Sequence, residues 1–174
     1  MPPDLRGMLE PGERVLWVGR PVRAVAVLAS LPILLFAAPF ILIPVLALPG
    51  PAWTQPVVQV FFAFWYALTL PIAFLPLYAY LAADKTWYLL SDRRIVVRKG
   101  VIGTDYDVLG LDKVQQVNVN VGLVDKFYGT GSIKVQAIGV EPITLQAVKE
   151  PYKVQKLILK ALEEARRAAS LTQP

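Results

Sequence analysis

Two long stretches of the chain contain no charged side chain, and they separate a short N-terminal segment from a longer C-terminal part. The stretches are Ala24–Leu48 and Val57–Ala83. A helix of about 20 apolar residues crosses a hydrocarbon core of about 30 Å. A backbone in lipid must pair its own N–H and C=O groups, so both stretches are predicted to be transmembrane helices. The connector, residues 49–56, is rich in proline, which predicts a helical hairpin.

After residue 84 the hydrophobic pattern changes to a period of two, which is typical of strands with one buried face. Three segments show it clearly: 117–121, 133–137 and 143–147. Turn residues separate these segments from one another and from earlier apolar runs. We therefore expect six or seven antiparallel strands in a sandwich or a partly open barrel.

The pattern changes once more at Pro151, where it predicts a C-terminal amphipathic helix. Pro151 suits a first helical turn. Apolar residues then recur at helical spacing on one face: Val154, Leu157, Ile158, Ala161, Leu162 and Ala165. The opposite face is charged, so we expect the apolar stripe to cover the open sheet.

Composition narrows the chemistry that the chain can perform. The sequence contains no histidine and no cysteine. The usual zinc ligands, the thiolate nucleophile and the imidazole base are therefore excluded, and no disulfide can form. The net charge of +5 is modest, whereas a nucleic-acid-binding domain has a dense basic stripe. We expect no nucleic-acid partner and no cofactor.

Basic residues predict the orientation of the hairpin, because short loops rich in lysine and arginine stay in the cytoplasm. The connector, residues 49–56, contains no lysine or arginine. The two flanking segments have nine: Arg6, Arg14, Arg20, Arg23, Lys85, Arg93, Arg94, Arg98 and Lys99. A cleaved signal peptide is the alternative for the first stretch, but its apolar region would be about 7 to 15 residues long. We expect a multi-pass protein of the plasma membrane with both termini in the cytoplasm.

Neither stretch contains an ionisable residue, although transporters and channels generally place such residues within the membrane. Prolines occur in both stretches and could indicate the broken helices of a carrier. Proline is also common in ordinary spans, where neighbouring helices satisfy the freed carbonyls. The pattern therefore favours an anchor over a carrier.

Four motifs of the chain resemble a known family. They are Glu10–Pro21, Trp87–Val101, Leu109–Val117 and Phe127–Val135. Together with the hairpin and the final helix, they resemble the bacterial PH-domain family of small membrane proteins, the YdbS-like group. The resemblance implies a pleckstrin-homology architecture, in which antiparallel strands are capped by a C-terminal helix. It implies a membrane-tethered binding or scaffolding module without catalytic residues.

The resemblance and the hydrophobic pattern together predict three parts. Residues 1–21 form a cytoplasmic segment, residues 22–83 form the transmembrane hairpin with spans of about 24–48 and 57–83, and residues 84–174 form a cytoplasmic PH-like domain. If residues 85–90 pair with residues 95–100, Lys85 lies opposite Gly100. The turn with Arg93 and Arg94 then lies about 20 Å from the membrane end, at about 3.3 Å per residue.

The leading functional hypothesis is a membrane-anchored scaffold that engages a protein partner or further copies of itself. A sheet edge or the first hairpin, with Arg93 and Arg94 as candidate contacts, would bind the partner. The chain departs from the basic pattern with which animal PH domains bind phosphoinositides, so no phosphoinositide site is expected.

Two alternatives stay open. The first is sensing of anionic lipid headgroups by a basic belt of Arg23, Lys85, Arg98 and Lys99. The second is a metal-dependent enzyme that uses Asp105, Asp107 and Asp112, since three carboxylates can hold a divalent cation. Turn aspartates more often bond to their own backbone, and no nucleophile accompanies them. We therefore expect the chain not to be an enzyme and to contain no catalytic or metal site.

Overall fold

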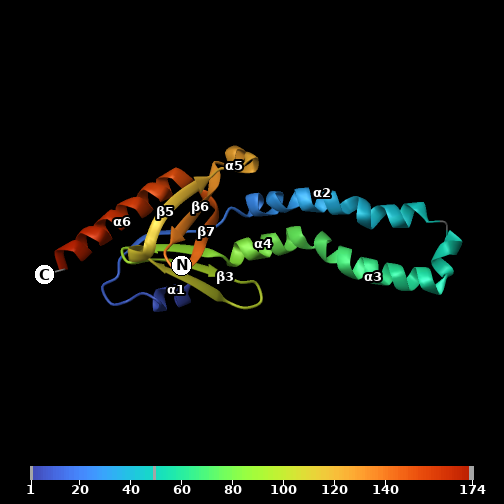
Figure 1. Cartoon of the computed structure of the whole chain (residues 1–174), viewed down its shortest axis with the longest axis horizontal. Helices are drawn as coiled ribbons and strands as arrows, with labels where there is room; N and C mark the ends of the chain where they lie inside the picture. Colours follow the sequence, from blue (N-terminus) through green and yellow to red (C-terminus); the bar gives the residue numbers. More distant parts are fainter. Residues whose placement is uncertain (1, 49, 173–174) are drawn as a thin grey trace.

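The computed structural model describes residues 2–48 and 50–172, and it consists of a long helical hairpin that projects from a two-sheet domain (Figure 1). The helices are α1 (Pro3–Gly7), α2 (Arg23–Ala47), α3 (Pro56–Ala73), α4 (Leu75–Lys85), α5 (Leu123–Tyr128) and α6 (Pro151–Thr172), with 3₁₀ turns η1 (Gly50–Thr54) and η2 (Leu111–Lys113). The strands are β1 (Val15–Gly19), β2 (Trp87–Ser91), β3 (Arg94–Lys99), β4 (Asp105–Gly110), β5 (Val114–Asn120), β6 (Thr130–Ala137) and β7 (Val140–Lys149).

The first apolar stretch forms one helix, but the second does not. Helix α3 ends at Ala73 and α4 begins at Leu75, with Phe74 between them. Pro76 lies at the start of α4 and has no N–H to continue the bonding pattern of α3. The prediction of a single helix over 57–83 was therefore wrong. By length and composition, α2 and α3 each suffice to cross a membrane.

Proline also shapes the contact between α2 and α3. Pro44 lies inside α2 and cannot donate to the carbonyl of Phe40, four residues earlier. The indole N–H of Trp65 on α3 donates to that carbonyl at 2.9 Å. The hydroxyl of Tyr66 lies 3.3 Å from the neighbouring carbonyl of Ile41. The aromatic side chains of α3 thus supply the donor that the proline of α2 lacks.

The strands form two antiparallel sheets, with the orders β1-β2-β3-β4 and β5-β6-β7. The register of β2 and β3 pairs Trp87 with Arg98 and Leu90 with Ile95. That is the register expected from the sequence, although Lys85 itself ends α4. The three segments with a period of two became β5, β6 and β7, as predicted.

Strand β1 comes from the N-terminal segment, which the sequence analysis had set apart from the domain. It pairs antiparallel with β2, and Val18 lies opposite Leu89. The chain leaves the sheet at the end of β1, runs through α2, α3 and α4, and returns as β2. The hairpin is therefore an insertion between two neighbouring strands of one sheet. In the part of the chain that the structure describes, six strands follow residue 84, and the seventh precedes the hairpin.

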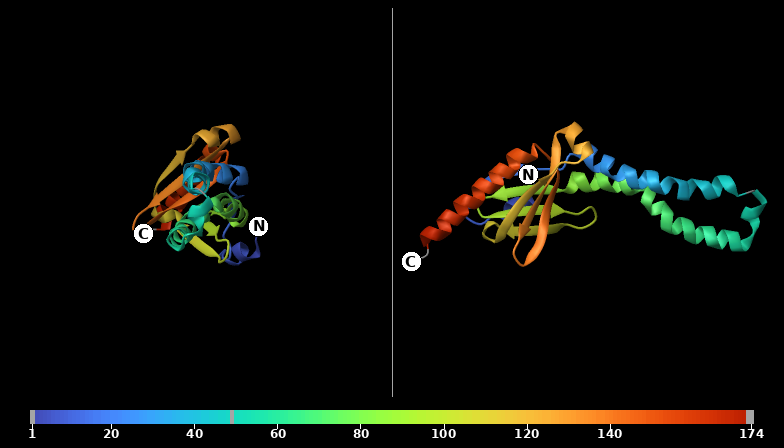
Figure 2. Two further views of the ribbon diagram at one scale, coloured as in Figure 1. Left: turned by 90° about the vertical axis from the view of Figure 1, so that its right-hand side faces the viewer. Right: turned by 45° about the horizontal axis from the view of Figure 1, so that its top comes forward.

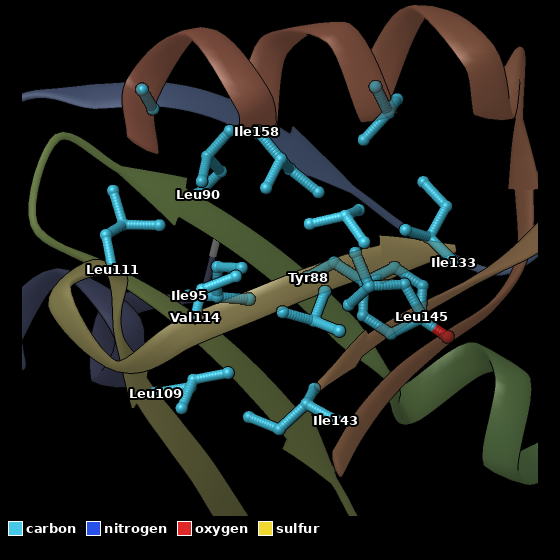
Figure 3. Packing of buried hydrophobic residues seen from close by; sticks show 14 of the residues in the cluster. Tyr88, Leu90, Ile95, Leu109, Leu111, Val114, Ile133, Ile143, Leu145 and Ile158 are labelled. Atoms are coloured by element: carbon cyan, nitrogen blue, oxygen red, sulfur yellow. The ribbon is translucent and has the colours of Figure 1, made fainter. Parts of the chain in front are cut away.

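The core lies between the two sheets and under α6 (Figure 3). Ile158 of α6 is fully buried against it, together with Ile133 of β6 and Leu145 of β7. Helix α6 therefore covers the sheets as expected. One residue departs from the predicted stripe, because Leu157 is 39% exposed.

Helix α5 was not predicted, because only turns were expected between the strands of the domain. Gly129 ends α5 with a positive φ of 63°, which glycine adopts without strain. Thr130 and Gly131 already belong to β6. The short helix α5 thus forms the connection between β5 and β6.

Candidate functional site

The base of the hairpin is fastened to the domain at several points. The backbone N–H of Val22 donates to the carbonyl of Ala147 on β7 at 2.9 Å. Helix α2 begins directly after this bond, and α4 ends two residues before β2. The two helices are thus joined to the domain by very short connections, which restrict their movement relative to the sheets.

Two arginines at this base contact aromatic rings. Arg23 forms an ion pair with Asp84, and its guanidinium lies 5.5 Å from the ring of Tyr80 and 3.4 Å from the Tyr80 hydroxyl. The guanidinium of Arg20 lies 3.4 Å from the ring of Trp87. Arg23, a candidate lipid contact, therefore already has an acidic partner on the other helix of the hairpin.

Two further residues of the predicted basic belt, Arg98 and Lys99, are also paired within the molecule. Arg98 forms an ion pair with Asp4 at 3.0 Å and donates to the carbonyl of Lys85 at 3.1 Å. Lys99 forms an ion pair with Asp107 on β4. The side chain of Arg98 is only 17% exposed. Three of the four belt residues thus have carboxylate partners, which weakens their attraction for anionic headgroups.

A groove with a volume of about 860 Å³ separates the hairpin base from the domain. The helices α2 and α4 line one side with small and apolar side chains, including Val25, Ala26 and Ala79. The domain lines the other side from β6, β7, α5 and the segment that follows β3. The groove therefore lies at the end of the domain from which the hairpin projects.

The opposite end of the domain carries a polar network around the turn between β2 and β3. Arg93 and Arg94 each form an ion pair with Glu10, and Arg94 also pairs with Glu13 at 3.1 Å. The hydroxyl of the buried Ser91 donates to Glu13 at 2.6 Å. The candidate partner contacts Arg93 and Arg94 are therefore held by acids of the N-terminal segment.

The carboxylate of Glu13 is fully shielded from solvent, with a side-chain exposure of 0%. Burial by itself raises the pKa of this carboxyl. The hydrogen bonds from Ser91 and the backbone of Glu10, with the charge of Arg94, outweigh burial and hold the pKa of Glu13 below its usual value. The hydrogen bond from Arg94 likewise lowers the pKa of Glu10. Both acids are thus ionised at neutral pH.

Two of the edge strands, β5 and β4, differ in what covers them. On β5, the carbonyls of Val117 and Val114 accept hydrogen bonds from Gln155 at 2.9 Å and from Arg166 at 3.1 Å, both on α6. The final helix therefore occupies this edge. Strand β4 ends the other sheet, and no strand among residues 2–48 and 50–172 pairs with its outer side. Its Val108 side chain is 46% exposed.

Comparison with known families decides how this arrangement is classified. A family described as the bacterial PH domain matches residues 15–162, from β1 into α6. The chain belongs to the bacterial PH domain family. The match includes both β1 and β2, so the inserted hairpin lies within the matched range.

Among solved structures, this bacterial PH domain is similar to a DUF1696 family protein with a pleckstrin-homology domain from Shewanella loihica. The two chains are 15% identical, with a TM-score of 0.38. The similarity covers 46% of this chain and 73% of the other. A comparison with curated proteins gave no match.

The structure does not gather the acidic residues that the enzyme hypothesis needs. Asp107 pairs with Lys99, Asp105 begins β4, and Asp112 lies in η2. Within the described ranges, no group of three or more acidic side chains could hold a metal ion. The arrangement of these three aspartates therefore does not support the hypothesis of a metal-dependent enzyme.

Tyr88 is a buried titratable residue that connects the two sheets. Its hydroxyl lies 3.0 Å from both the backbone N–H and the carbonyl of Gln146 on β7. Burial raises the pKa of Tyr88 to about 12, against the smaller effect of its backbone hydrogen bond. It stays neutral near pH 7 and acts as a structural link in this bacterial PH domain.

Sequence reasoning missed the acids that pair with the candidate cations. Asp84 carried a usable signal, since Arg23 and Asp84 stand at the two ends of the predicted hairpin and must lie at similar depth. Asp4, Glu10 and Glu13 carried no such signal, because their partners lie between 81 and 94 residues further along the chain. Those contacts follow from the unforeseen pairing of β1 with β2.

Proposed function

We propose that this chain is a membrane-anchored binding module without catalytic activity. In this proposal the hairpin crosses the plasma membrane with both ends in the cytoplasm. The PH-like domain lies at the inner face and binds a protein partner along β4. The observation that carries the proposal is the open edge of β4, which contrasts with the edge of β5, where α6 accounts for two of the backbone carbonyls.

The exposure of the hairpin supports anchoring. Leu35, Leu46 and Val57 are each exposed to between 78% and 80%. A soluble protein rarely exposes so continuous an apolar surface. Helix α2, with 25 residues, is about 37 Å long, which exceeds the hydrocarbon thickness of about 30 Å.

Charge and aromatic residues support the orientation. The η1 connector has no lysine or arginine, and it contains Trp53, a residue type enriched at membrane interfaces. Basic residues occur on both sides of the hairpin base, where the rule for positive residues places the cytoplasm. Tyr78 and Tyr80 lie near this base and are 58% and 45% exposed, as interfacial aromatic residues are.

Binding along β4 follows from the chemistry of an edge strand. An extended segment of a partner can add to such an edge through main-chain hydrogen bonds, while side-chain contacts give specificity. The β4 strand also presents Tyr106, which is 36% exposed, beside Val108. By contrast, Arg93, Arg94 and most of the basic belt are already paired, so contacts through free cations are less favourable.

Topology can be tested in cells, because the chain contains no cysteine and each introduced thiol is unique. We would compare Thr54→Cys in the connector with Lys156→Cys on the exposed face of α6. A membrane-impermeant maleimide should label Thr54→Cys in intact spheroplasts and Lys156→Cys only after lysis. Labelling of both from outside, or of neither, would contradict the proposed topology.

Partner binding can be tested with a photo-crosslinking amino acid at Val108 in the full chain. Val140 on β7 is the control, because it is also a valine with 46% exposure. We expect a discrete protein adduct from position 108 and none from position 140. An adduct with the mass of a dimer would identify a second copy as the partner. Equal adducts from both positions, or none from 108, would refute binding along β4.

A further inference from the structure

Three apolar side chains of the domain are far more exposed than folding requires. Ile102 is 103% exposed, Phe127 89% and Leu123 79%, the highest values for large apolar residues in the described range after residue 84. Ile102 lies in the loop between β3 and β4, and the other two lie on α5. We call these three residues the apolar rim.

Helix α5 turns its apolar face away from the domain. Leu123 and Phe127 are four residues apart and therefore lie on the same side of the helix. Asp125, between them, faces the domain, where it accepts hydrogen bonds from the backbone of Gly122 at 3.0 Å and from the hydroxyl of Thr130 at 2.6 Å. The polar residue holds the helix in place, and the two large apolar residues contribute little to the core.

The two parts of the rim lie on opposite sides of the hairpin base. Viewed along the hairpin, α5 lies on one side of the helices and the loop between β3 and β4 on the other (Figure 2). Both segments border the groove at the base, since Gly100, Val101 and Asp125 line it together with Val25 and Ala79. The rim therefore belongs to the end of the domain from which the helices project.

The length of α2 places this end at the membrane surface. The helix is about 7 Å longer than the hydrocarbon core of about 30 Å. The headgroup layer on one side of a bilayer has a similar thickness, about 5 to 8 Å. If the connector lies at the outer interface, the domain meets the inner headgroup layer without a gap.

We propose that the apolar rim inserts into the inner leaflet on both sides of the hairpin and docks the domain on the membrane. This inference rests on the proposed anchoring, and it adds the surface that faces the lipid. The rim would bind the apolar boundary beneath the lipid headgroups, where burial of exposed aromatic and aliphatic side chains lowers the free energy. Docking should therefore depend little on lipid charge, whereas a basic belt would require anionic lipid and lose affinity with salt.

The test uses the full chain in lipid vesicles with one environment-sensitive NBD label at a time. The labelled variants are Ile102→Cys and Phe127→Cys in the rim, Ile138→Cys as control and Phe61→Cys in the hairpin. Ile138 is also an apolar residue, 65% exposed. The backbone N–H of Ile138 donates to the carbonyl of Lys113 in η2. In the same turn, the N–H of Leu111 donates to the carbonyl of Arg93, so Ile138 is linked to the far end of the domain.

Quenching by brominated lipid then reports depth. We expect labels at 102 and 127 to be quenched at least about twofold more than the label at 138, because an interfacial group lies about 5 to 10 Å into the headgroup boundary. The difference should persist in zwitterionic vesicles and at high salt. Quenching at 61 but not at 102 and 127 would overturn the rim while leaving the anchoring intact. No quenching at 61 would overturn the anchoring, and the rim with it.

Discussion

The hairpin and the PH-like domain are stabilised in opposite ways. In the domain, the buried residues are large and apolar, such as Leu90, Ile133 and Leu145, and polar groups lie around the sheets. In the hairpin, many large apolar residues face outward, and the buried residues among those described are small, namely Val25, Ala37 and Ala83. Between α2 and α3, a polar contact connects the helices, from Trp65 to the carbonyl of Phe40.

If the hairpin spans the membrane as proposed, the difference reflects the two solvents, water and lipid, that surround the two parts. In water, burial of large apolar side chains drives folding. In lipid that drive is absent, so helices associate through close packing of small residues and through hydrogen bonds. The same type of substitution should therefore have different effects on stability in the two regions.

The largest effect should come from removing β1. A fragment of residues 84–174 lacks the strand that pairs with β2 and the acids that pair with Arg94. We expect it to be at least about 3 kcal/mol less stable than a chain in which residues 2–20 are joined to residues 87–174 by an Asn-Gly turn. Urea unfolding of the two proteins measures the difference. Equal stability would mean that β1 is dispensable.

The contrast in burial can be tested with one substitution made in both regions. Leu145 is 1% exposed in the core, and Leu46 is 80% exposed on the hairpin. Leu145→Ala should destabilise the domain by about 2 to 5 kcal/mol, since it leaves a cavity. Leu46→Ala should leave the unfolding of the domain unchanged. Similar losses from both variants would show that the two regions do not differ in this way.

The polar contact in the hairpin can be tested by a double-mutant cycle. Trp65→Phe leaves the Phe40 carbonyl without its donor, and we expect a loss of about 0.5 to 2 kcal/mol in helix association in bilayers. Pro44→Ala restores a backbone N–H for that carbonyl. In the Pro44→Ala background, Trp65→Phe should therefore cost less. Additive losses, measured by steric trapping in bilayers, would argue against this explanation.

The smallest effect concerns Glu13 at the polar end of the domain. Its pKa is lowered in the folded state, so its contribution to stability is present above the unfolded pKa of about 4.5 and is lost as the pH falls through the folded pKa. Glu13→Gln should destabilise the protein at pH 7 and make its stability less sensitive to pH below 4.5. Thermal unfolding between pH 3 and pH 7 would test this. Glu150→Gln, at an exposed residue, is the control.

The sequence allowed good prediction where a pattern is local. Strands β5, β6 and β7 alternate polar and apolar residues over their own length, and α6 has a helical stripe that begins at Pro151. The register of β2 with β3 follows from the short turn between them. In each case the prediction needs only the local pattern, because the segment that buries the apolar face lies nearby in the chain or can be any apolar surface.

The missed features depend on distant partners or short segments. Strand β1 has five residues, and its partner β2 follows only after the whole hairpin. Helix α5, with six residues, is too short for a periodic signal. The acidic partners of Arg93, Arg94 and Arg98 lie in the N-terminal segment around β1, so they could not be found without the position of that segment. Pro71 and Pro76 indicate a break in the helix near Phe74, but the prediction of one continuous helix did not take them into account.

The position of the hairpin between β1 and β2 has a consequence for biosynthesis. During translation β1 leaves the ribosome before either helix of the hairpin, and it has no partner until β2 has been made. If the hairpin spans the membrane as proposed, the two strands can meet only when the chain has returned to its original side. A chain that inserted only one of the two helices would keep β1 and β2 on opposite sides of the bilayer. Closure of this sheet would thus act as a checkpoint, in which folding of the domain depends on insertion of the two helices as a pair.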